Sequence, residues 1–503
     1  MHPMTSADVL KLLESEGLPH NLQTSVMQLF EAIEHGHTAQ PLCNEDADAW
    51  SETLAQSDLT QLFAVNQSTL QIQRHFSQES RVADALKKLS SHPAHIINID
   101  PRQLMPHADG SQQKTIVGAA GQRLSIVTGG PGTGKTTTAA AIIAAKRTLF
   151  RKMPHIALVA PTGKAAVKLT ESFQMAVSNM EAVELESVAA TTIHRQLKEL
   201  KLADIVLVDE ASMVSLDLFD QLLKSLSDNA HLILMGDPNQ LASVEAGSIL
   251  KVISESNALV DNCFELKQRH RIGNQRNLAQ LQDLCLLGNS QEFIQALKEI
   301  GIFWESNQQI DRLEKAVLDG YQEYVEDVKK TGVPAQPDFQ CLTSITEGIG
   351  GRRMINQLMQ AEIQSLGLNG FGERVLVTEN QPAIGVFNGD IGIVVESSDT
   401  KYPRVSFESV NQPLLKNQLG SVESAWAISI HRSQGSEYQS VLISLPEPVS
   451  SRSRFKPSRE LLYTALTRAK EGVKLFATET MIDQAVSRKT HRVTCLEHFL
   501  KTS

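Results

Sequence analysis

The sequence predicts an α/β protein of two lobes, preceded by a helical N-terminal domain. Three observations lead to this prediction. A glycine-rich phosphate-binding loop lies between a predicted strand and a predicted helix. Short apolar runs alternate with helical stretches through the middle of the chain, which is the pattern of buried parallel strands. A second alternation of this kind begins near residue 338. With 503 residues, the chain is too long for one ordinary core, so several domains are expected.

Residues 1–105 are expected to form the helical domain. The stretches ADVLKLLESEG, SVMQLFEAIEHG and RVADALKKLSS have the apolar spacing of amphipathic helices. The passage IDPRQLMPHADGSQ contains two prolines and predicts the linker to the first lobe, which we expect over residues 106–250.

The phosphate-binding loop fits G-x-x-x-x-G-K-[ST] at every fixed position. Its glycines let backbone N–H groups face a phosphate, and the helix N-terminus that follows adds its positive dipole end. We expect Lys135 to reach the β- and γ-phosphates of ATP and the Thr136 hydroxyl to bind Mg²⁺. The alternative, a plain glycine turn, does not explain why strand, loop and helix follow in this order. The loop residues are Gly129, Gly130, Pro131, Gly132, Thr133, Gly134, Lys135 and Thr136.

Two carboxylates follow another predicted strand of the same lobe, DIVLVDEAS. Ligands of open α/β sheets bind at the carboxyl ends of the strands. We therefore assign Asp209 to Mg²⁺, and Glu210 to orienting and deprotonating the attacking water. The alternative for Glu210 is an exposed carboxylate at a helix start.

The second lobe is expected over residues 251–503. Its predicted strands are DFQCLTSI, AWAISI, SVLISLP and GVKLFAT, and residues 461–470 are predicted to be helical. Closely spaced β runs with Gly, Asn and Pro turns lie between residue 372 and about residue 408, within an insertion expected over about 372–424. This spacing predicts a small β-barrel-like insertion in the second lobe.

Composition excludes several classes of protein. The sequence contains no run of about 18 apolar residues, so no membrane span is expected. The N-terminus lacks the features of a secretory signal. The five cysteines are scattered without a CxxC, which argues against a disulfide framework or zinc site and fits a reducing cytoplasm. The net charge of −10 argues mildly against nucleic acid, but it does not exclude a local basic groove.

An ordered set of motifs between Gln112 and Lys470 resembles the RecD family of superfamily 1 helicases. The motifs are GGPGTGKTTT, APTGKAAVKLTES, TTIHRQL, VDEASM, GDPNQLASVEAG, KQRHRIG, FNGDIG, HRSQGSEY and YTALTRAK. The resemblance implies a bacterial protein with two RecA-like lobes, ATP between them and single-stranded DNA across the top.

The resemblance also implies roles for residues around the nucleotide. Gln112 matches the glutamine that reads adenine, with Gln113 as the second candidate. Gln240 is expected to sense the γ-phosphate. Arg271 and Arg468 match arginine fingers, although Arg269 is an alternative to Arg271 and a helix-surface position is the alternative for Arg468. Guanidinium groups suit this role because phosphoryl transfer builds charge on the γ-phosphate oxygens.

Two groups of residues resemble the DNA contacts of the family. In the first lobe these are Thr162, Lys164, Thr191 and His194. In the loop after the strand AWAISI they are His431, Arg432, Ser433 and Gln434, with Gln434 and Glu437 expected to face the cleft and Glu437 the ribose.

This loop departs from the family pattern at two positions. Arg432 and Tyr438 stand where the family commonly has Lys and Phe, and Arg does not bind a phosphate as Lys does. The alternative for the loop is a tight turn whose polar groups satisfy one another. The basic run at residues 451–460 is interpreted first as a solvated loop and second as a DNA contact.

The resemblance implies an ATP-dependent 5′–3′ DNA helicase. It is expected to be the RecD-like subunit of a RecBCD-type exonuclease V, which acts on double-strand break ends in recombinational repair. The short N-terminal segment without repeated glycine hairpins favours this over a free-standing helicase, and its helices are expected either to dock a RecC-like partner or to cap the first lobe. The nuclease would belong to a RecB-like partner. Other readings are an ATP-dependent DNA-binding switch that does not translocate and a small-molecule kinase, which would not need the second lobe with Arg468.

Overall fold

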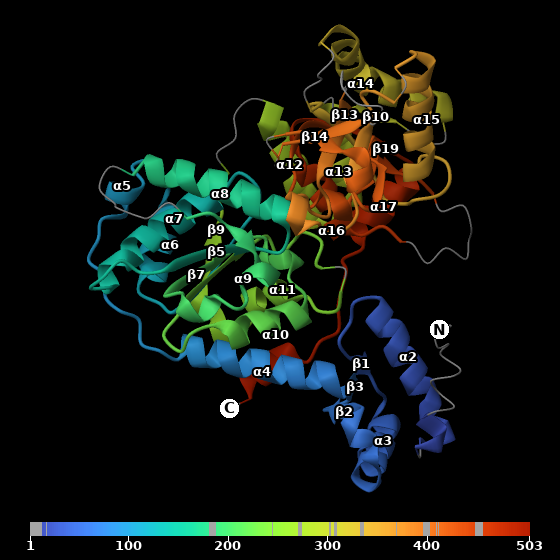
Figure 1. Ribbon diagram of the computed structural model, residues 1–503. Helices are drawn as coiled ribbons and strands as arrows, with labels where there is room; N and C mark the ends of the chain where they lie inside the picture. The colour runs from blue at the N-terminus through green and yellow to red at the C-terminus, as the bar shows by residue number, and fades with distance from the viewer. Residues whose placement is uncertain are drawn as a thin grey trace.

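The computed structural model has two α/β lobes side by side and a smaller N-terminal unit (Figure 1). The structure describes residues 13–16, 18–180, 188–243, 245–269, 274–300, 303–305, 309–331, 336–368, 370–395, 403–408, 410, 412–447 and 456–502. Within these residues, no helix is both long and apolar enough to cross a membrane.

The N-terminal unit contains a small antiparallel sheet as well as helices. Its elements are α2 (Gln23–Glu34), β1 (Gln40–Pro41), α3 (Asn44–Gln56), β2 (Phe63–Asn66) and β3 (Thr69–Ile72), and its sheet has the order β1-β3-β2. The helical domain that we expected therefore also contains a three-stranded sheet. The hairpin β2–β3 turns at residues 67–68, where Gln67 has a φ of 51°. The usual sequence signal for such a turn is Asn-Gly or another glycine pair, which this chain lacks here.

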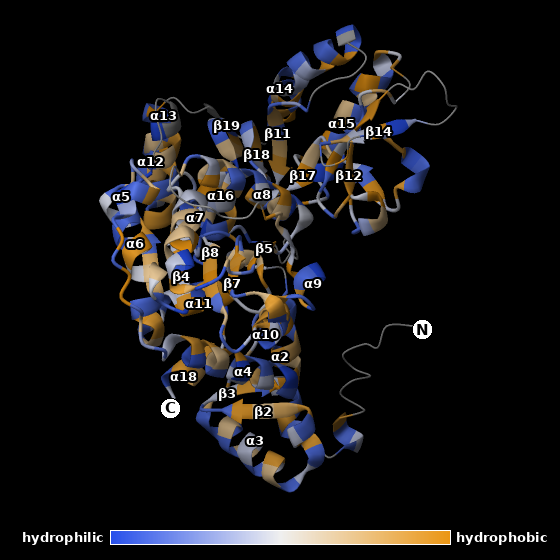
Figure 2. Cartoon of the chain, turned by 60° about the vertical axis from the view of Figure 1, so that its left-hand side comes forward, coloured by the Kyte–Doolittle hydropathy of each residue, from blue (hydrophilic) through white to orange (hydrophobic). Residues whose placement is uncertain are grey.

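The next helix, α4 (Gln73–Ser90), packs against the first lobe. Its buried residues Val82 and Leu86 share a hydrophobic core with Leu222 and Ile253 of that lobe. In Figure 2, α4 lies between the rest of the N-terminal unit and the first lobe. The first lobe therefore depends on residues that precede the expected boundary at 105. Two helices follow, the short α5 (Pro101–Leu104) and the longer α6 (Gly110–Ala120).

The first lobe is built on a six-stranded sheet in which each pair of neighbours is parallel. The order is β6-β5-β7-β8-β4-β9, comprising β4 (Leu124–Gly129), β5 (Ile156–Ala160), β6 (Thr191–Thr192), β7 (Ile205–Val208), β8 (His231–Gly236) and β9 (Cys263–Leu266). Strand β9 extends this lobe beyond residue 250, where we expected it to end.

Helices cover both faces of this sheet. One face is covered by α6, α7 (Lys135–Lys146) and α8 (Gly163–Ser178). The other is covered by α4, α10 (Leu216–Ser225), α11 (Ile249–Glu255) and the C-terminal helix α18 (Leu496–Lys501). The short helix α9 (Ile193–Gln196) follows β6. The strands are buried along their length, which explains their continuous apolar sequences.

The second lobe repeats this layered arrangement with a parallel five-stranded sheet of order β10-β19-β18-β11-β17. The strands are β10 (Phe303–Glu305), β11 (Phe339–Thr343), β17 (Ala427–Ser429), β18 (Tyr438–Leu445) and β19 (Ala469–Ala477). One face carries α12 (Asn274–Leu287), α13 (Ser290–Glu299), α16 (Arg459–Thr467) and α17 (Glu479–Ser487). The other carries α14 (Ile310–Thr331) and α15 (Arg352–Ser365).

The insertion in the second lobe is an open antiparallel sheet. Its order is β15-β14-β13-β12-β16, with β12 (Arg374–Val377), β13 (Ile391–Val395), β14 (Arg404–Phe407), β15 (Leu414–Leu415) and β16 (Val422–Ser424). The expected barrel would need its two edge strands to pair, and in the described part of the insertion β15 and β16 remain at opposite edges. The ring of Phe387 packs against Gly163, so the insertion also contacts the first lobe.

Candidate active site

The phosphate-binding loop connects the buried strand β4 to α7. Gly132 and Gly134 have φ values of 76°, which glycine adopts without steric cost. The Lys135 ammonium donates to the carbonyl oxygens of Gly129 at 2.8 Å and Gly130 at 3.1 Å. This places the cation inside the loop, where an incoming phosphate could replace the carbonyl partners.

Gln112 forms a hydrogen bond to the backbone of the phosphate-binding loop. Its amide nitrogen donates to the Thr133 carbonyl at 3.0 Å, and its amide oxygen accepts from the backbone of Asp109 in a capping box that begins α6. The side chain is fully buried. An amide engaged at both ends is not presented to adenine, so this structure does not support the expected role of Gln112. Gln113, the second candidate, is partly buried and donates to the Ala108 carbonyl at 2.6 Å.

The two acidic residues lie at the end of β7, as expected. The Asp209 carboxylate accepts from the backbone N–H of Glu210 at 2.8 Å. Burial, together with the charge of Glu210, raises the pKa of Asp209 to about 6. Glu210 has a φ of 51°, a strained value for a residue with a side chain. Strain of this kind persists only where the surrounding fold imposes it.

Gln240 and Arg468 meet across the two lobes. An Nη2 donor of Arg468 lies 3.0 Å from the Gln240 side-chain oxygen. The same guanidinium donates to the carbonyl oxygens of Thr464 and Ser436, and only 3% of the residue is exposed. The alternative of a helix-surface arginine is therefore wrong.

A second contact between the lobes lies beside the phosphate loop. The Tyr463 hydroxyl donates to the buried carboxylate of Asp237 at 2.9 Å. A β-carbon built on Gly130 would lie 3.1 Å from this hydroxyl and 3.3 Å from Arg269 Nη2, so both side chains border the loop. Arg269 is held by an ion pair of 2.8 Å with Asp283. Arg271, the expected finger, lies outside the described residues. Its alternative, Arg269, borders the phosphate loop at Gly130 but is not among the residues that line the nucleotide cavity.

A cavity of about 270 Å³ lies between these elements and is lined from both lobes. Its oxygen donors include the Thr136 hydroxyl and the carboxylates of Asp209 and Glu210, a set that suits Mg²⁺ when phosphate oxygens complete it. The described residues contain no separate cluster of three or more His, Cys, Asp or Glu side chains that could hold a metal. The lining brings together the phosphate loop, Asp209, Glu210, Gln240, Glu437 and Arg468.

In the loop at 431–438, some polar residues that we expected to contact DNA are exposed and others are buried. His431 is exposed, and Arg432, with an ion pair of 2.7 Å to Glu423, is partly exposed. Ser433 is buried and donates to the Ile430 carbonyl within its own loop at 2.7 Å, so its expected DNA contact is not supported. Gln434 is 7% exposed and donates to the Leu241 carbonyl of the first lobe at 2.7 Å.

The first-lobe candidates for DNA contact lie at the starts of two helices. Thr162 caps α8 through a bond from the Ala165 N–H at 3.2 Å, and the Lys164 ammonium lies 5.8 Å from the centre of the Tyr438 ring. Thr191 donates to the Gln196 side chain at 3.0 Å, whereas His194 on α9 is exposed. Of the basic run at 451–460, residues 451–455 lie outside the described part, and Arg459 holds carbonyl oxygens within the lobe.

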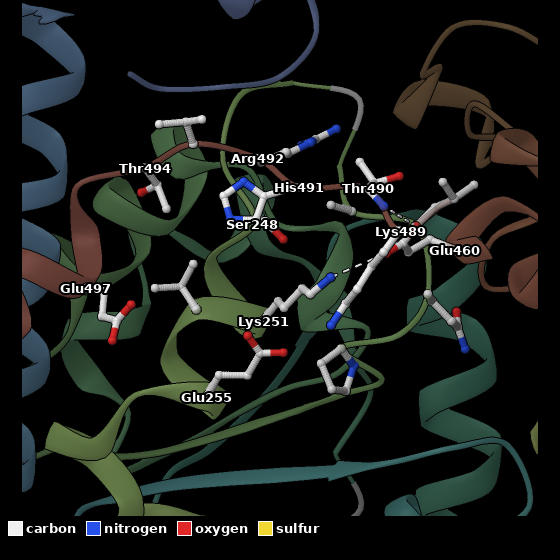
Figure 3. A pocket seen from close by; sticks show the side chains of 16 residues that line it. Ser248, Lys251, Glu255, Glu460, Lys489, Thr490, His491, Arg492, Thr494 and Glu497 are labelled. Carbon is white, nitrogen blue, oxygen red and sulfur yellow. Dashed lines mark hydrogen bonds and ion pairs between the residues drawn. The ribbon is translucent and has the colours of Figure 1, made fainter. Parts of the chain in front are cut away.

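A larger cavity of about 530 Å³ lies on the other side of Gln240, between α11, the start of α16 and residues 489–497 (Figure 3). In Figure 3, Lys251 of the first lobe reaches toward Glu460 of the second, with an N–O distance of 3.3 Å. Arg492 donates to the carbonyl oxygens of Ser243, Glu245 and Gly247. The residues that line this cavity carry equal numbers of Glu side chains and of Lys or Arg side chains, and the phosphate loop is not among them. We therefore interpret the cavity as a contact region between the two lobes and the C-terminal segment.

Several residues of this site were missed in the sequence. Tyr463 and Thr464 lie about one turn before Arg468, and the Thr464 hydroxyl accepts a hydrogen bond from the Leu241 backbone N–H at 2.9 Å. Lys168 follows Lys164 by four residues, a spacing that places both on one face of a helix. Lys168 forms an ion pair of 2.6 Å with Glu437 of the other lobe. The spacing was visible in the sequence, but the partner across the cleft was not.

Comparisons with known proteins show which families the chain is similar to. Residues 107–308 match the model of the AAA domain family, and residues 424–476 match that of the UvrD-like helicase C-terminal domain. The chain is 32% identical to the RecBCD enzyme subunit RecD of Mycolicibacterium smegmatis, over 91% of this chain and 87% of that one. It is 31% identical to the protein of the same name from Mycobacterium tuberculosis, over 86% and 80% of the two chains.

Two further matches are more distant. The ATP-dependent RecD2 DNA helicase of Deinococcus radiodurans is 28% identical over 74% of this chain and 49% of its own length. The crystal structure of Bacteroides Pif1 bound to single-stranded DNA is 16% identical, with a TM-score of 0.41 over 74% of this chain and 93% of that one.

Proposed function

The chain belongs to the RecD family of DNA helicases, and from this premise we propose that it is the ATP-driven 5′–3′ helicase subunit of a RecBCD-type helicase and nuclease. The curated relatives that it matches along most of both chains carry the name of that subunit. The 5′–3′ polarity and the action on double-strand break ends follow from the family resemblance.

One observation carries the proposal of a motor. The nucleotide cavity is lined by both lobes, and Arg468 of the second lobe lies 3.0 Å from Gln240 of the first. A guanidinium supplied from the opposite lobe makes hydrolysis depend on how the lobes are arranged. Hydrolysis that is linked to lobe movement is what a translocating ATPase requires.

The residues of the cavity divide the chemistry among them. Lys135 would exchange its two carbonyl partners for phosphate oxygens. Thr136 and Asp209 would hold Mg²⁺, which when bound would offset the charge of the phosphate oxygens. Glu210 would orient the attacking water and accept its proton. Gln240 and Arg468 would exchange their mutual bond for contacts to the γ-phosphate.

DNA binding is proposed for residues that the structure leaves accessible. His194, His431 and Arg432 are exposed or partly exposed, and Thr162 and Lys164 start α8 beside the 431–438 loop. Gln434 is assigned instead to communication between the lobes, since its amide bonds to the Leu241 carbonyl.

Partner docking is proposed for the N-terminal unit. RecB-like and RecC-like subunits are the partners that the family implies, and the nuclease would reside in the RecB-like one. Deletion of residues 1–105 would remove α4 from the core of the first lobe, so surface substitutions give a cleaner test. Met27→Glu with Leu62→Glu changes two exposed apolar side chains of the unit, 38% and 45% accessible. Loss of co-purification with both partners is expected, whereas Leu202→Glu on the first lobe should keep it.

The motor itself is tested with the purified chain, alone and with its partners. We expect ATP turnover that single-stranded DNA stimulates, and unwinding of a duplex with a 5′ tail. An ATP-dependent DNA-binding switch would bind both ligands without repeated turnover. Unwinding only from 3′ tails would contradict the assigned polarity, and turnover indifferent to DNA would contradict the motor.

A further inference from the structure

We infer that Arg492 is a positioning residue, and that it anchors a strap through which lobe movement in the ATPase cycle changes the contacts of the N-terminal unit. The strap is residues 489–495, which lie between α17 of the second lobe and α18 in the core of the first. It borders the cavity of about 530 Å³ on the far side of Gln240 (Figure 3). This inference rests on the proposed motor and goes beyond it, because it gives the N-terminal unit a part in the ATPase cycle.

The second lobe holds the strap at Thr490. The Thr490 N–H donates to Glu460 Oε2, at the start of α16, at 2.9 Å. Glu460 is 6% exposed, and its other carboxylate oxygen accepts from Lys251 of the first lobe at 3.3 Å. Arg492, the next anchor, follows two residues later, and two residues of extended chain span at most about 7 Å. Movement of one lobe relative to the other at this point would therefore break an anchor or displace the segment that Arg492 holds.

Arg492 holds the first-lobe segment that follows Gln240. Its Nη1 atom donates to the carbonyl oxygens of Gly247 at 2.7 Å and Glu245 at 3.0 Å, and its Nη2 atom donates to that of Ser243 at 2.7 Å. A planar guanidinium presents its donors in a fixed geometry, so one side chain sets the arrangement of these carbonyl groups. Ser243 lies three positions after Gln240, which lines the nucleotide cavity. A displacement of the strap therefore acts on a segment that begins at the nucleotide.

The N-terminal unit packs on the same guanidinium. Gly36, between α2 and β1, has a φ of 82°, and a β-carbon built on it would lie 2.5 Å from Arg492 Cζ, so the two groups are in direct contact. The Gly36 carbonyl accepts from the Gly247 N–H at 3.0 Å, and the Thr38 N–H donates to the Val493 carbonyl at 3.0 Å. Arg492 therefore lies between the first lobe and the N-terminal unit, and its displacement changes the contacts of both.

A buried carboxylate fixes the last residues of the strap. Glu79 of α4 is fully buried, and its two oxygens accept hydrogen bonds from both the N-terminal unit and the strap. The donors are the Thr38 hydroxyl at 2.5 Å, the Gln71 amide at 2.8 Å, the Cys495 N–H at 3.0 Å and the Thr494 hydroxyl. Residues 489–491, by contrast, are exposed. A buried polar network with these bonds is rigid, so a movement that enters at Thr490 is carried into the N-terminal unit and is not absorbed at the end of the strap.

The test measures hydrogen exchange of backbone amides in the full chain by mass spectrometry. The probe is Mg²⁺ with a non-hydrolysable ATP analogue, and the peptides cover residues 129–137, 36–42 and 489–496. In the wild type, the analogue should change exchange in all three, by at least about fivefold in residues 36–42, the lower end of typical coupling between two sites. In Arg492→Gln, residues 129–137 should still respond and the response of residues 36–42 should be lost. Arg492→Lys should keep part of this response, because an ammonium reaches fewer of the carbonyl oxygens.

Lys489→Gln is the matched control, because it removes a charge of the same sign from an exposed position of the same strap, beside the same cavity. It should respond as the wild type does, and an equal loss in both variants would assign the effect to the charge of the cavity and overturn the inference. No response of residues 36–42 in the wild type would overturn it whatever the variants do.

The melting temperature separates positioning from a merely structural role. A lower melting temperature of Arg492→Gln with the response of residues 36–42 retained would overturn the inference as well. The proposed motor is measured by DNA-stimulated turnover, whereas this test needs only binding of the analogue. A failure of the motor is therefore distinguishable from a failure of the strap.

Discussion

Gln434→Ala tests whether the 431–438 loop links DNA binding to ATP hydrolysis. The Gln434 amide donates to the Leu241 carbonyl at 2.7 Å, and Leu241 directly follows Gln240 of the nucleotide cavity. The same Leu241 receives a second contact from the other lobe, since its N–H donates to the Thr464 hydroxyl at 2.9 Å. The substitution therefore removes one of two bonds by which the second lobe holds the Leu241 backbone.

The size of the effect follows from the bond that is lost. A buried neutral hydrogen bond, with its acceptor left unpaired, is worth on the order of 1–2 kcal/mol. If that free energy biases the closed arrangement of the lobes, stimulation by single-stranded DNA should fall by about five- to thirtyfold. Basal hydrolysis should change only a few-fold, because Lys135, Glu210 and Arg468 remain in place.

The assay measures the ratio of DNA-stimulated to basal turnover together with the melting temperature. Ser433→Ala is the matched control: the Ser433 hydroxyl also makes a bond of 2.7 Å, but to Ile430 within its own loop. It should lower the melting temperature and leave the ratio unchanged. If both variants lower the melting temperature and neither changes the ratio, the loop is only a tight turn and the reasoning fails.

Four further predictions concern the cavity. Lys135→Gln should reduce ATP hydrolysis by at least about a hundredfold, the scale of one charged transition-state contact; unwinding of a 5′-tailed duplex at normal speed by this variant alone would contradict the motor. Glu210→Gln should abolish turnover and keep ATP binding, measured by calorimetry, because the amide retains the shape but accepts no proton; loss of binding would make Glu210 a metal ligand or a structural residue. The pKa of Asp209, about 6, predicts that Mg²⁺-dependent ATP binding weakens as pH falls below that value, about tenfold per unit, since the proton competes for the carboxylate. The raised pKa also means that the ionised group destabilises the folded chain, a cost absent below its ordinary 3.8 and complete above about 6. Asp209→Asn should therefore raise the melting temperature at neutral pH and not in acid, and an equal shift at both would refute the assignment.

The local elements of the nucleotide site were determined by the sequence alone. Strand β4, the glycine loop and α7 follow one another within a few residues, and their apolar spacing, positive φ values and helix start are local properties. The same is true of Asp209 and Glu210, which end a strand whose buried character is visible in four consecutive apolar residues.

Other features depended on contacts between distant parts of the chain. Gln112 has the position of an adenine-reading residue in the motif order. Its amide is instead hydrogen-bonded to the backbones of Asp109 and Thr133, and no local sequence pattern predicts the bond to Thr133. Ser433 and Gln434 are neighbours of similar polarity, and packing alone decides that one bonds within its loop and the other across the lobes.

The boundaries of the domains were also decided by packing. Helix α4 has an amphipathic sequence that fits any apolar surface, and the tertiary structure gives that surface to the first lobe, together with the C-terminal helix α18. Strand β9 joins the first sheet because it pairs with β4, more than a hundred residues earlier. The pairing of Lys168 with Glu437 is a further case, because these two residues are 269 positions apart in the sequence. Sequence periodicity shows which face of a helix or strand is apolar. Which surface that face packs against is decided only when the hydrophobic cores form from distant parts of the chain.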